Sequence, residues 1–257
     1  MTTTISVINQ KGGVGKTTTV INLAASLSIM GQTNLVIDLD PQGNATTGSG
    51  INNAAVVSST YDVLINGMVV ADAKIAVDAS GYDLLPANVD LSGAEVELMD
   101  IPSREHRLRN ALESCSRSYD YIIIDCPPSL SLLTLTGLVA ANGVIIPMQC
   151  EYYALEGLTA LIGTISRITN RLNSELEIKG IVRTMFDPRN RLANEVSDDL
   201  VDHFGDLVFS TIIPRNVRLA EAPSYGLPIM YYDKQSRGAR AHLALAGELV
   251  KRLESGD

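Results

Sequence analysis

The chain has 257 residues, of which 46% are apolar and 19% charged, and this is enough for one large hydrophobic core. It contains no run of about 18 uncharged apolar residues and no signal-peptide pattern at its start, so we expect a cytoplasmic protein rather than a membrane-spanning or secreted one. The formal net charge of −9 argues, at first sight, against binding to polyanions such as DNA or an anionic membrane.

The chain alternates short β-rich apolar runs with helix-length amphipathic segments, which is typical of a parallel sheet with helices on both faces. The expected fold class is α/β: a three-layer, doubly wound, mainly parallel sheet in a single domain over residues 1–257. Strands are predicted near 4–9, 33–39, 82–86, 119–124, 143–148, 178–185 and 207–213. Helices are predicted at 16–30, 92–99, 103–115, 130–141, 154–171, 192–204 and 236–254.

Local signals mark several element boundaries. Gly31 ends the first predicted helix, Ser103 is a candidate cap for another, and the pair Pro127-Pro128 stops the strand that ends at Asp125. Residues 41–59, rich in Gly, Asn, Ser and Thr, are predicted to form one long irregular loop. A loop of this length inside a compact domain is usually functional or mobile.

A phosphate-binding motif follows the first strand and opens the first helix: Lys11-Gly12-Gly13-Val14-Gly15-Lys16-Thr17-Thr18. The glycines let successive backbone N–H groups point at a phosphate, and the helix N-terminus adds its dipole. Lys16 supplies a charge for the β- and γ-phosphates, and the Thr17 hydroxyl is placed to bind Mg²⁺. These residues together predict an ATP site with Mg²⁺. The alternative is a glycine turn that merely joins the strand to the helix.

The motif departs from the common form GxxxxGK[ST], because Gln10 stands where the first glycine belongs and a second lysine follows at Lys11. This spelling resembles the deviant phosphate loop of the ParA/MinD group of ATPases. The resemblance implies that Lys11 contacts the nucleotide of the partner subunit in a sandwich dimer, where an added cation stabilises the transferred phosphoryl group. A lysine that simply faces solvent is the alternative.

Acidic side chains end two further apolar strands. Asp38 and Asp40 lie in the segment Ile37-Asp38-Leu39-Asp40-Pro41, and strand alternation predicts that both face the same way at the ligand-binding end of the sheet. The family resemblance assigns the attacking water to Asp40, while Asp38 is expected to organise Mg²⁺ and its waters. Simple helix-capping carboxylates are the alternative. Asp125 ends another strand and has the Walker B form, which holds Mg²⁺ through water.

The resemblance extends over nearly the whole chain and is most specific to the chromosomal ParA (Soj) proteins. The segments DLDPQGNAT, DCPPSL and IPRNVRLAEAPSYGLPI carry it. It implies that the base is adenine, that Pro214, Arg215 and Asn216 line its pocket, and that Met185 lies against the ring. We also expect catalytic roles for Lys11, Lys16 and Asp40.

Positive charge is uneven along the chain. Residues 1–103 hold 3 Lys and Arg against 10 Asp and Glu, whereas residues 104–257 hold 17 against 19. The resemblance implies that late basic residues bind DNA non-specifically on a dimer, and Arg218 and Arg189 rank highest because they fall inside resembling segments. The others in this set are Arg191, Arg215, Lys234, Arg237 and Arg240. A solvated surface with ordinary salt bridges is the alternative.

The function implied is an ATP-dependent switch in chromosome or plasmid segregation. The resemblance predicts an ATP-dependent homodimer, binding to double-stranded DNA of the nucleoid, slow hydrolysis, and stimulation by a ParB/Spo0J-type centromere-binding partner. No stable membrane association is expected.

Three other functions share parts of this pattern. A MinD-like membrane ATPase needs a basic amphipathic C-terminal helix, but residues 243–254 carry mixed charges and no aromatic residue. An electron-transfer ATPase resembling nitrogenase iron protein needs cluster cysteines, whereas Cys115, Cys126 and Cys150 do not match that arrangement and are expected to be reduced and buried. The third alternative is a nucleotide-binding scaffold that does not hydrolyse ATP, and the presence of Asp38, Asp40 and Asp125 argues against it.

Overall fold

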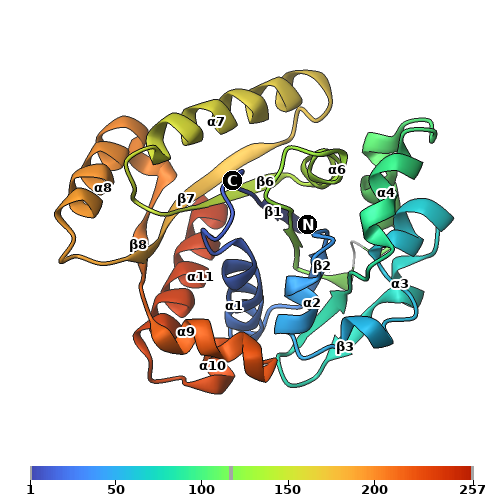
Figure 1. Ribbon diagram of the computed structural model, residues 1–257, viewed down its shortest axis with the longest axis horizontal. Helices are drawn as coiled ribbons and strands as arrows, with labels where there is room; N and C mark the ends of the chain where they lie inside the picture. Colours follow the sequence, from blue (N-terminus) through green and yellow to red (C-terminus); the bar gives the residue numbers. More distant parts are fainter. Residues whose placement is uncertain (1, 116–117, 256–257) are drawn as a thin grey trace.

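A computed structural model describes residues 2–115 and 118–255. Its core is an eight-stranded sheet in the order β3-β4-β2-β5-β1-β6-β7-β8, parallel except for the edge strand β3 (Figure 1). The strands are β1 (Thr3–Val7), β2 (Asn34–Asp38), β3 (Ile75–Val77), β4 (Tyr82–Leu85), β5 (Tyr121–Asp125), β6 (Gly143–Met148), β7 (Glu177–Phe186) and β8 (Val208–Pro214). The predicted fold class is confirmed.

Helices cover both faces of this sheet (Figure 1). The longer ones are α1 (Lys16–Ile29), α4 (Leu91–Leu98), α5 (Arg107–Glu113), α6 (Leu132–Ala140), α7 (Ala154–Arg171), α8 (Arg191–Phe204) and α11 (Arg237–Ser255). The short ones are α2 (Asn44–Gly48), α3 (Val70–Ala73), α9 (Val217–Glu221) and α10 (Ile229–Tyr232). All predicted strands and long helices are present, with boundaries shifted by a few residues.

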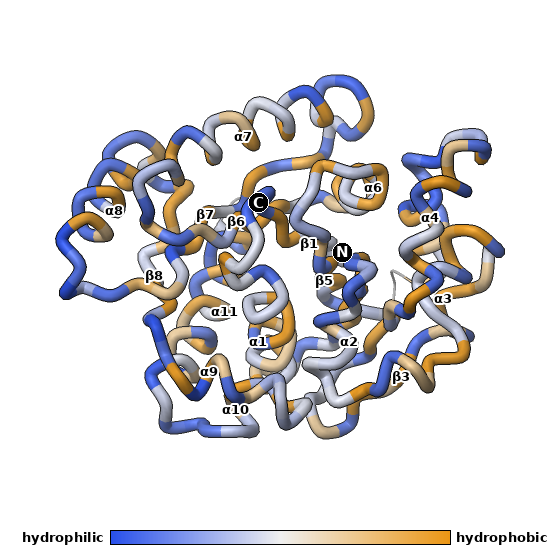
Figure 2. Tube along the Cα trace, in the orientation of Figure 1, coloured by the Kyte–Doolittle hydropathy of each residue, from blue (hydrophilic) through white to orange (hydrophobic). Residues whose placement is uncertain are grey.

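Two hydrophobic clusters fill the spaces between the three layers. Alternate residues of β5 serve the two sides: Ile122 and Ile124 pack with α4 to α8, and Ile123 packs with α1 and α11. Because both faces are covered, the central strands are buried and mainly apolar, and hydrophilic residues collect on outer turns such as those of α8 (Figure 2). Cys115, Cys126 and Cys150 are free and buried, as expected.

Two local predictions are wrong. Ser103 does not cap a helix: it has a φ of 51° and makes no capping bond, and a 3₁₀ turn at 104–106 separates it from α5. Residues 41–59 are not one irregular loop, because they contain α2 and a 3₁₀ turn at 53–55. Composition alone suggested a loop, whereas the bonds from Thr46 to Asp38 hold this segment in a helical turn.

Two glycines bring distant segments into contact beside the sheet. Gly226, with a φ of 65°, lies against the backbone of Gly50, and a β-carbon on either residue would collide with the other. Gly50 directly follows α2 and its C-cap, and Gly226 ends the turn after α9. The contact therefore requires glycine on both sides.

The variant Gly226→Ala tests this contact. The added methyl group meets the Gly50 backbone and strains a left-handed conformation, so the free energy of unfolding should fall by about 2–4 kcal/mol, as measured by urea denaturation. The control Gly163→Ala, at a position in α7 where a β-carbon meets nothing within 4 Å, should raise stability by about 0.5–1 kcal/mol. Equal stability of the two variants would contradict the packing described.

Candidate functional site

The phosphate loop joins β1 to α1 and leaves its backbone amides available. Gly13 and Gly15 have φ values of 75° and 87°, and Gly15 begins α1 without any side-chain cap. A β-carbon placed on Gly12 or Gly13 would meet nothing within 4 Å. The loop is therefore an open cradle of N–H groups at a helix N-terminus, which suits an anion such as a polyphosphate.

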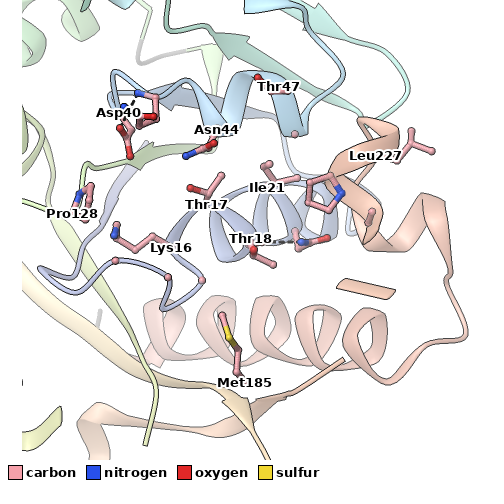
Figure 3. A pocket seen from close by; sticks show the side chains of 18 residues that line it. Lys16, Thr17, Thr18, Ile21, Asp40, Asn44, Thr47, Pro128, Met185 and Leu227 are labelled. Carbon is pink, nitrogen blue, oxygen red and sulfur yellow. Dashed lines mark hydrogen bonds between the residues drawn. The ribbon is translucent and has the colours of Figure 1, made fainter. Parts of the chain in front are cut away.

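A cavity of about 440 Å³ opens over this loop. In Figure 3, Lys16 and Thr17 extend from the start of α1 into the same space as Asp40 and Asn44, while Pro128 borders it from the segment after β5. Lys16 is 7% exposed, and burial lowers the pKa of its amine against the opposing effect of nearby carboxylates. A phosphate group entering the cavity would restore the stability of the charged amine.

Thr17 lines the cavity and connects it to Asp125, which is fully buried behind it. The Thr17 hydroxyl donates a 2.7 Å hydrogen bond to Asp125 Oδ2, while Oδ1 is buried and has no partner among the described residues. Burial, reinforced by Asp38, raises the pKa of the Asp125 carboxyl well above its usual range. A buried carboxylate with an unpaired oxygen beside a hydroxyl fits Mg²⁺, which takes its other ligands from water and phosphate.

Asp38 and Asp40 have different surroundings, contrary to the prediction that they face the same way, because β2 ends at Asp38. Asp38 is fully buried and does not line the cavity: its carboxylate accepts bonds of 2.7 Å from both the amide and the hydroxyl of Thr46, and one from the Asp40 amide. Burial raises its pKa to about 6. Asp40 lines the cavity, and its Oδ1 accepts a 3.0 Å bond from the Gln42 amide.

Through these contacts Asp38 holds the Asp40 segment, and its expected part in organising Mg²⁺ and its waters stays a prediction. Its closeness to Asp125 still adds negative charge to the cation end of the site. Asp40, which borders the cavity from the side opposite the phosphate loop, is the carboxylate with access to a bound nucleotide (Figure 3).

Lys11 lies outside the cavity that Lys16 enters. Its amine forms an ion pair with Glu151, in the segment just before α7, and both side chains are about half exposed. The Lys11 amide is fixed by a 2.9 Å bond to the Asn9 side chain. The two lysines of the motif therefore point to different places: one faces its own cavity and the other faces the surface.

A second cavity, of about 360 Å³, continues from the first and shares Gly15, Thr18 and Met185 with it. The residues predicted to contact the base line this second cavity: Met185, Pro214, Arg215 and Asn216. Met185, the residue before the last in β7, has a φ of 49°, a left-handed conformation that is strained for a methionine and often marks a ligand site. The Asn216 side chain caps α9 by accepting a bond from the Leu219 amide.

Sequence reasoning missed several cavity residues. In the phosphate cavity these are Asn44, Thr47, Pro128 and Leu227, and in the second cavity Thr184, Val217 and His242. Asn44 and Thr47 follow Asp40 within the segment that was assigned as a loop, so recognition of α2 would have found them. No local signal distinguishes His242 from an ordinary helix residue.

Five of the candidate DNA-binding residues fall into two groups. Arg189 is paired with Asp187 through two hydrogen bonds, and Arg218 is paired with Glu221. Lys234, Arg237 and Arg240 are exposed and form no ion pair within the described parts of the chain. Arg237 and Arg240 lie in the first turn of α11, which has no acidic residue there. Cations at a helix N-terminus oppose the helix dipole, so this cluster costs stability.

The chain resembles known proteins over almost its whole length. A family model described as an AAA domain matches residues 2–178. An uncharacterized protein of Pseudomonas putida is 60% identical over 98% of this chain and 96% of its own. The sporulation initiation inhibitor protein Soj of Bacillus subtilis is 51% identical, covering 96% of this chain and 97% of that protein. The chromosome partitioning protein ParA of Caulobacter vibrioides is 49% identical, covering 96% and 94%.

Solved structures agree with this picture. A Mycobacterium smegmatis protein, described as a cobyrinic acid a,c-diamide synthase with bound ATP analog and magnesium, superimposes with a TM-score of 0.88 at 37% identity, covering 100% of this chain and 98% of that one. Pyrococcus horikoshii MinD, complexed with Mg-ADP, gives 0.82 at 26% identity, covering 99% and 98%. Fold and site together define a P-loop ATPase that uses ATP and Mg²⁺. The chain belongs to the ParA/Soj family of partitioning ATPases.

The variant Thr46→Val tests the link between Asp38 and the Asp40 segment. It removes a hydroxyl that donates to Asp38 and accepts from the Ala87 amide. We expect a loss of about 2 kcal/mol in unfolding free energy, which corresponds to a Tm about 4–8 °C lower in calorimetry. The control Thr159→Val, where an exposed hydroxyl bonds only to its own helix, should change stability by about 0.5 kcal/mol or less. An unchanged Tm for the Thr46 variant would show that Thr46 does not link Asp38 to the Asp40 segment.

Proposed function

We propose that this P-loop ATPase is a molecular switch for DNA segregation. ATP and Mg²⁺ bind, two copies close face to face, and the dimer binds nucleoid DNA without sequence preference. Hydrolysis then reopens it. A ParB/Spo0J-type protein bound at centromere-like sites stimulates that step in the cytoplasm. The whole cycle is assigned to one ATPase domain spanning residues 1–257. Partner, DNA and location are proposed from membership of the ParA/Soj family.

The position of Lys11 carries this proposal. Lys16 occupies the cavity of its own chain, whereas Lys11 belongs to the same motif but is half exposed and held by Glu151 at the surface. A cation placed there can reach the phosphates of a second copy that packs against this face. Dimerisation would then complete the active site, so hydrolysis and assembly would be coupled.

Within each site, Lys16 and the loop amides would bind the β- and γ-phosphates, while Thr17 and Asp125 would hold Mg²⁺. The cation supplies charge stabilisation for the transferred phosphoryl group. Asp40 would orient the attacking water from the opposite side of the cavity.

The second cavity is the candidate adenine pocket. Met185 would lie against the ring, because it belongs to both cavities and so stands where base and phosphates join. Pro214, Arg215 and Asn216 would form the surrounding wall at the end of β8.

For DNA binding, the ion pairs in the structure favour a different ranking of the candidate basic residues from the one based on the sequence. Arg189 and Arg218 are partly neutralised by their own acidic partners, whereas Lys234, Arg237 and Arg240 are exposed without such partners in the described chain. Because Arg237 and Arg240 oppose the helix dipole, they do not stabilise the fold, and binding of a phosphate group explains their presence better. A dimer would double it, which would let an acidic chain bind DNA.

A MinD-like membrane function has less support. The apolar face of α11 packs against α1 and β8, and Leu245 and Leu249 are fully buried there, so that face is not free to enter a bilayer. In addition, no helix within residues 2–115 and 118–255 is both long and apolar enough to cross a membrane.

The variant Asp40→Ala separates hydrolysis from assembly. Without a group to orient water, kcat should fall by about 10²–10⁴-fold, while ATP still drives dimerisation. Phosphate release measures the first and light scattering the second. Hydrolysis at the wild-type rate would show that Asp40 is not the catalytic carboxylate.

DNA binding is tested with the triple variant Lys234→Ala, Arg237→Ala, Arg240→Ala. In mobility shifts with ATP it should dimerise but lose more than tenfold in DNA affinity, and the slope of log affinity against log salt should flatten by about 0.9 per lost contact. The double variant Arg189→Ala, Arg218→Ala should lose less, and the control Arg171→Ala, in α7 on the other face of the sheet, should match the wild type.

A parallel co-sedimentation with anionic phospholipid vesicles, with and without ATP, tests the alternative membrane function. ATP-dependent binding to vesicles but not to DNA would replace the present proposal with the MinD-like one.

A further inference from the structure

His242 lies at the bottom of the second cavity. It belongs to the side of α11 that packs on α1, and its side chain is fully buried. It borders the cavity together with Thr18 and Thr19 of α1 and with Thr184 and Met185 of β7. The imidazole is therefore shielded from solvent but adjacent to the space assigned to the base.

The hydrogen bonds of the ring define which nitrogen carries the proton. Nδ1 is 3.0 Å from the Gly238 carbonyl oxygen, and a carbonyl oxygen can only accept, so Nδ1 carries the hydrogen. Burial lowers the pKa of the ring to about 4, so it is neutral near pH 7. Nε2 then presents a bare lone pair and can only accept a hydrogen bond.

No donor for this lone pair exists among the described residues. The neighbouring Thr184 hydroxyl donates instead to the Val14 carbonyl, at 2.7 Å. Asn216, which also lines this cavity, uses its side-chain oxygen on the Leu219 amide. A buried acceptor without a donor is rare in native proteins, and its position beside a ligand cavity points to a donor on the ligand.

We propose that His242 selects the base, with Nε2 accepting a hydrogen bond from the exocyclic 6-amino group of adenine. This rests on the proposed function, in which the second cavity holds the base. Guanine carries a carbonyl oxygen at that position, which would face the lone pair acceptor to acceptor. A site built to pair with a donor rejects a ligand that lacks it.

Calorimetric titration with nucleoside diphosphates tests the contact without hydrolysis. The wild type should bind ADP about tenfold more tightly than purine riboside 5′-diphosphate, which lacks only the 6-amino group, and should bind GDP more weakly still. The variant His242→Phe should bind ADP about tenfold more weakly, with the purine analogue little changed. The variant His242→Gln, whose amide oxygen can accept, should recover part of the preference for ADP.

The control His203→Phe alters an exposed histidine of α8 that also bonds to a backbone carbonyl, and it should leave all affinities unchanged. If His242→Phe keeps the full preference for ADP over the analogue, Nε2 is satisfied by water and the proposal is overturned. If the wild type binds neither ADP nor the analogue, the proposed function itself fails.

A measurement on the wild type covers the case in which the histidine variants do not fold. The ¹⁵N resonance of His242 Nε2 should move when ADP binds and should move much less with the purine analogue. An equal response to both ligands would overturn the assignment.

Discussion

The parallel register of β5 between β1 and β2 sets the position of the reacting groups. Asp125 stands opposite Val7 of β1 on one side and opposite Asp38 of β2 on the other. Since all three strands end at the same edge, the loop after β1 and the segment after β2 must face each other across Asp125. The hydroxyl of Thr17, in the first turn of the following helix, then comes within hydrogen-bond distance of it.

This register also brings two carboxyl groups and a lysine together in a low-dielectric interior, where burial disfavours the charged form of each group. Burial raises the pKa values of the Asp38 and Asp125 carboxyl groups, with added repulsion from Asp40 on Asp38 and from Asp38 on Asp125, while burial lowers the pKa of Lys16. A divalent cation would stabilise the ionised carboxylates, and a polyphosphate would stabilise the charged lysine. The arrangement thus favours the two ligands together over either one alone, which is the requirement for a site that recognises Mg²⁺ with ATP.

Much of this could be predicted from the sequence, because the deciding signals are local. The order of apolar runs and glycines defines a three-layer fold, and the spacing from Lys11 to Thr18 defines the phosphate loop. The different surroundings of Asp38 and Asp40 could not be predicted, since they depend on where β2 ends and on Thr46. His242 was missed for a similar reason: its place beside the second cavity comes from the packing of α11 on α1 and β8, a contact that no short pattern records. The pairing of Arg189 and Arg218 with nearby acids likewise needs side-chain geometry.

The meeting of Gly50 with Gly226 has a consequence for how the two cavities work together. Gly50 follows the helix that carries Asn44 and Thr47 at the first cavity, and Gly226 closes the turn after α9, a helix that forms part of the wall of the second cavity. With no side chain between them, the two backbones touch, and neither segment can move inward without displacing the other. The walls of the two cavities are therefore mechanically coupled through this contact, and a displacement of the segment around Gly226 would be transmitted through Gly50 to the helix that follows Asp40.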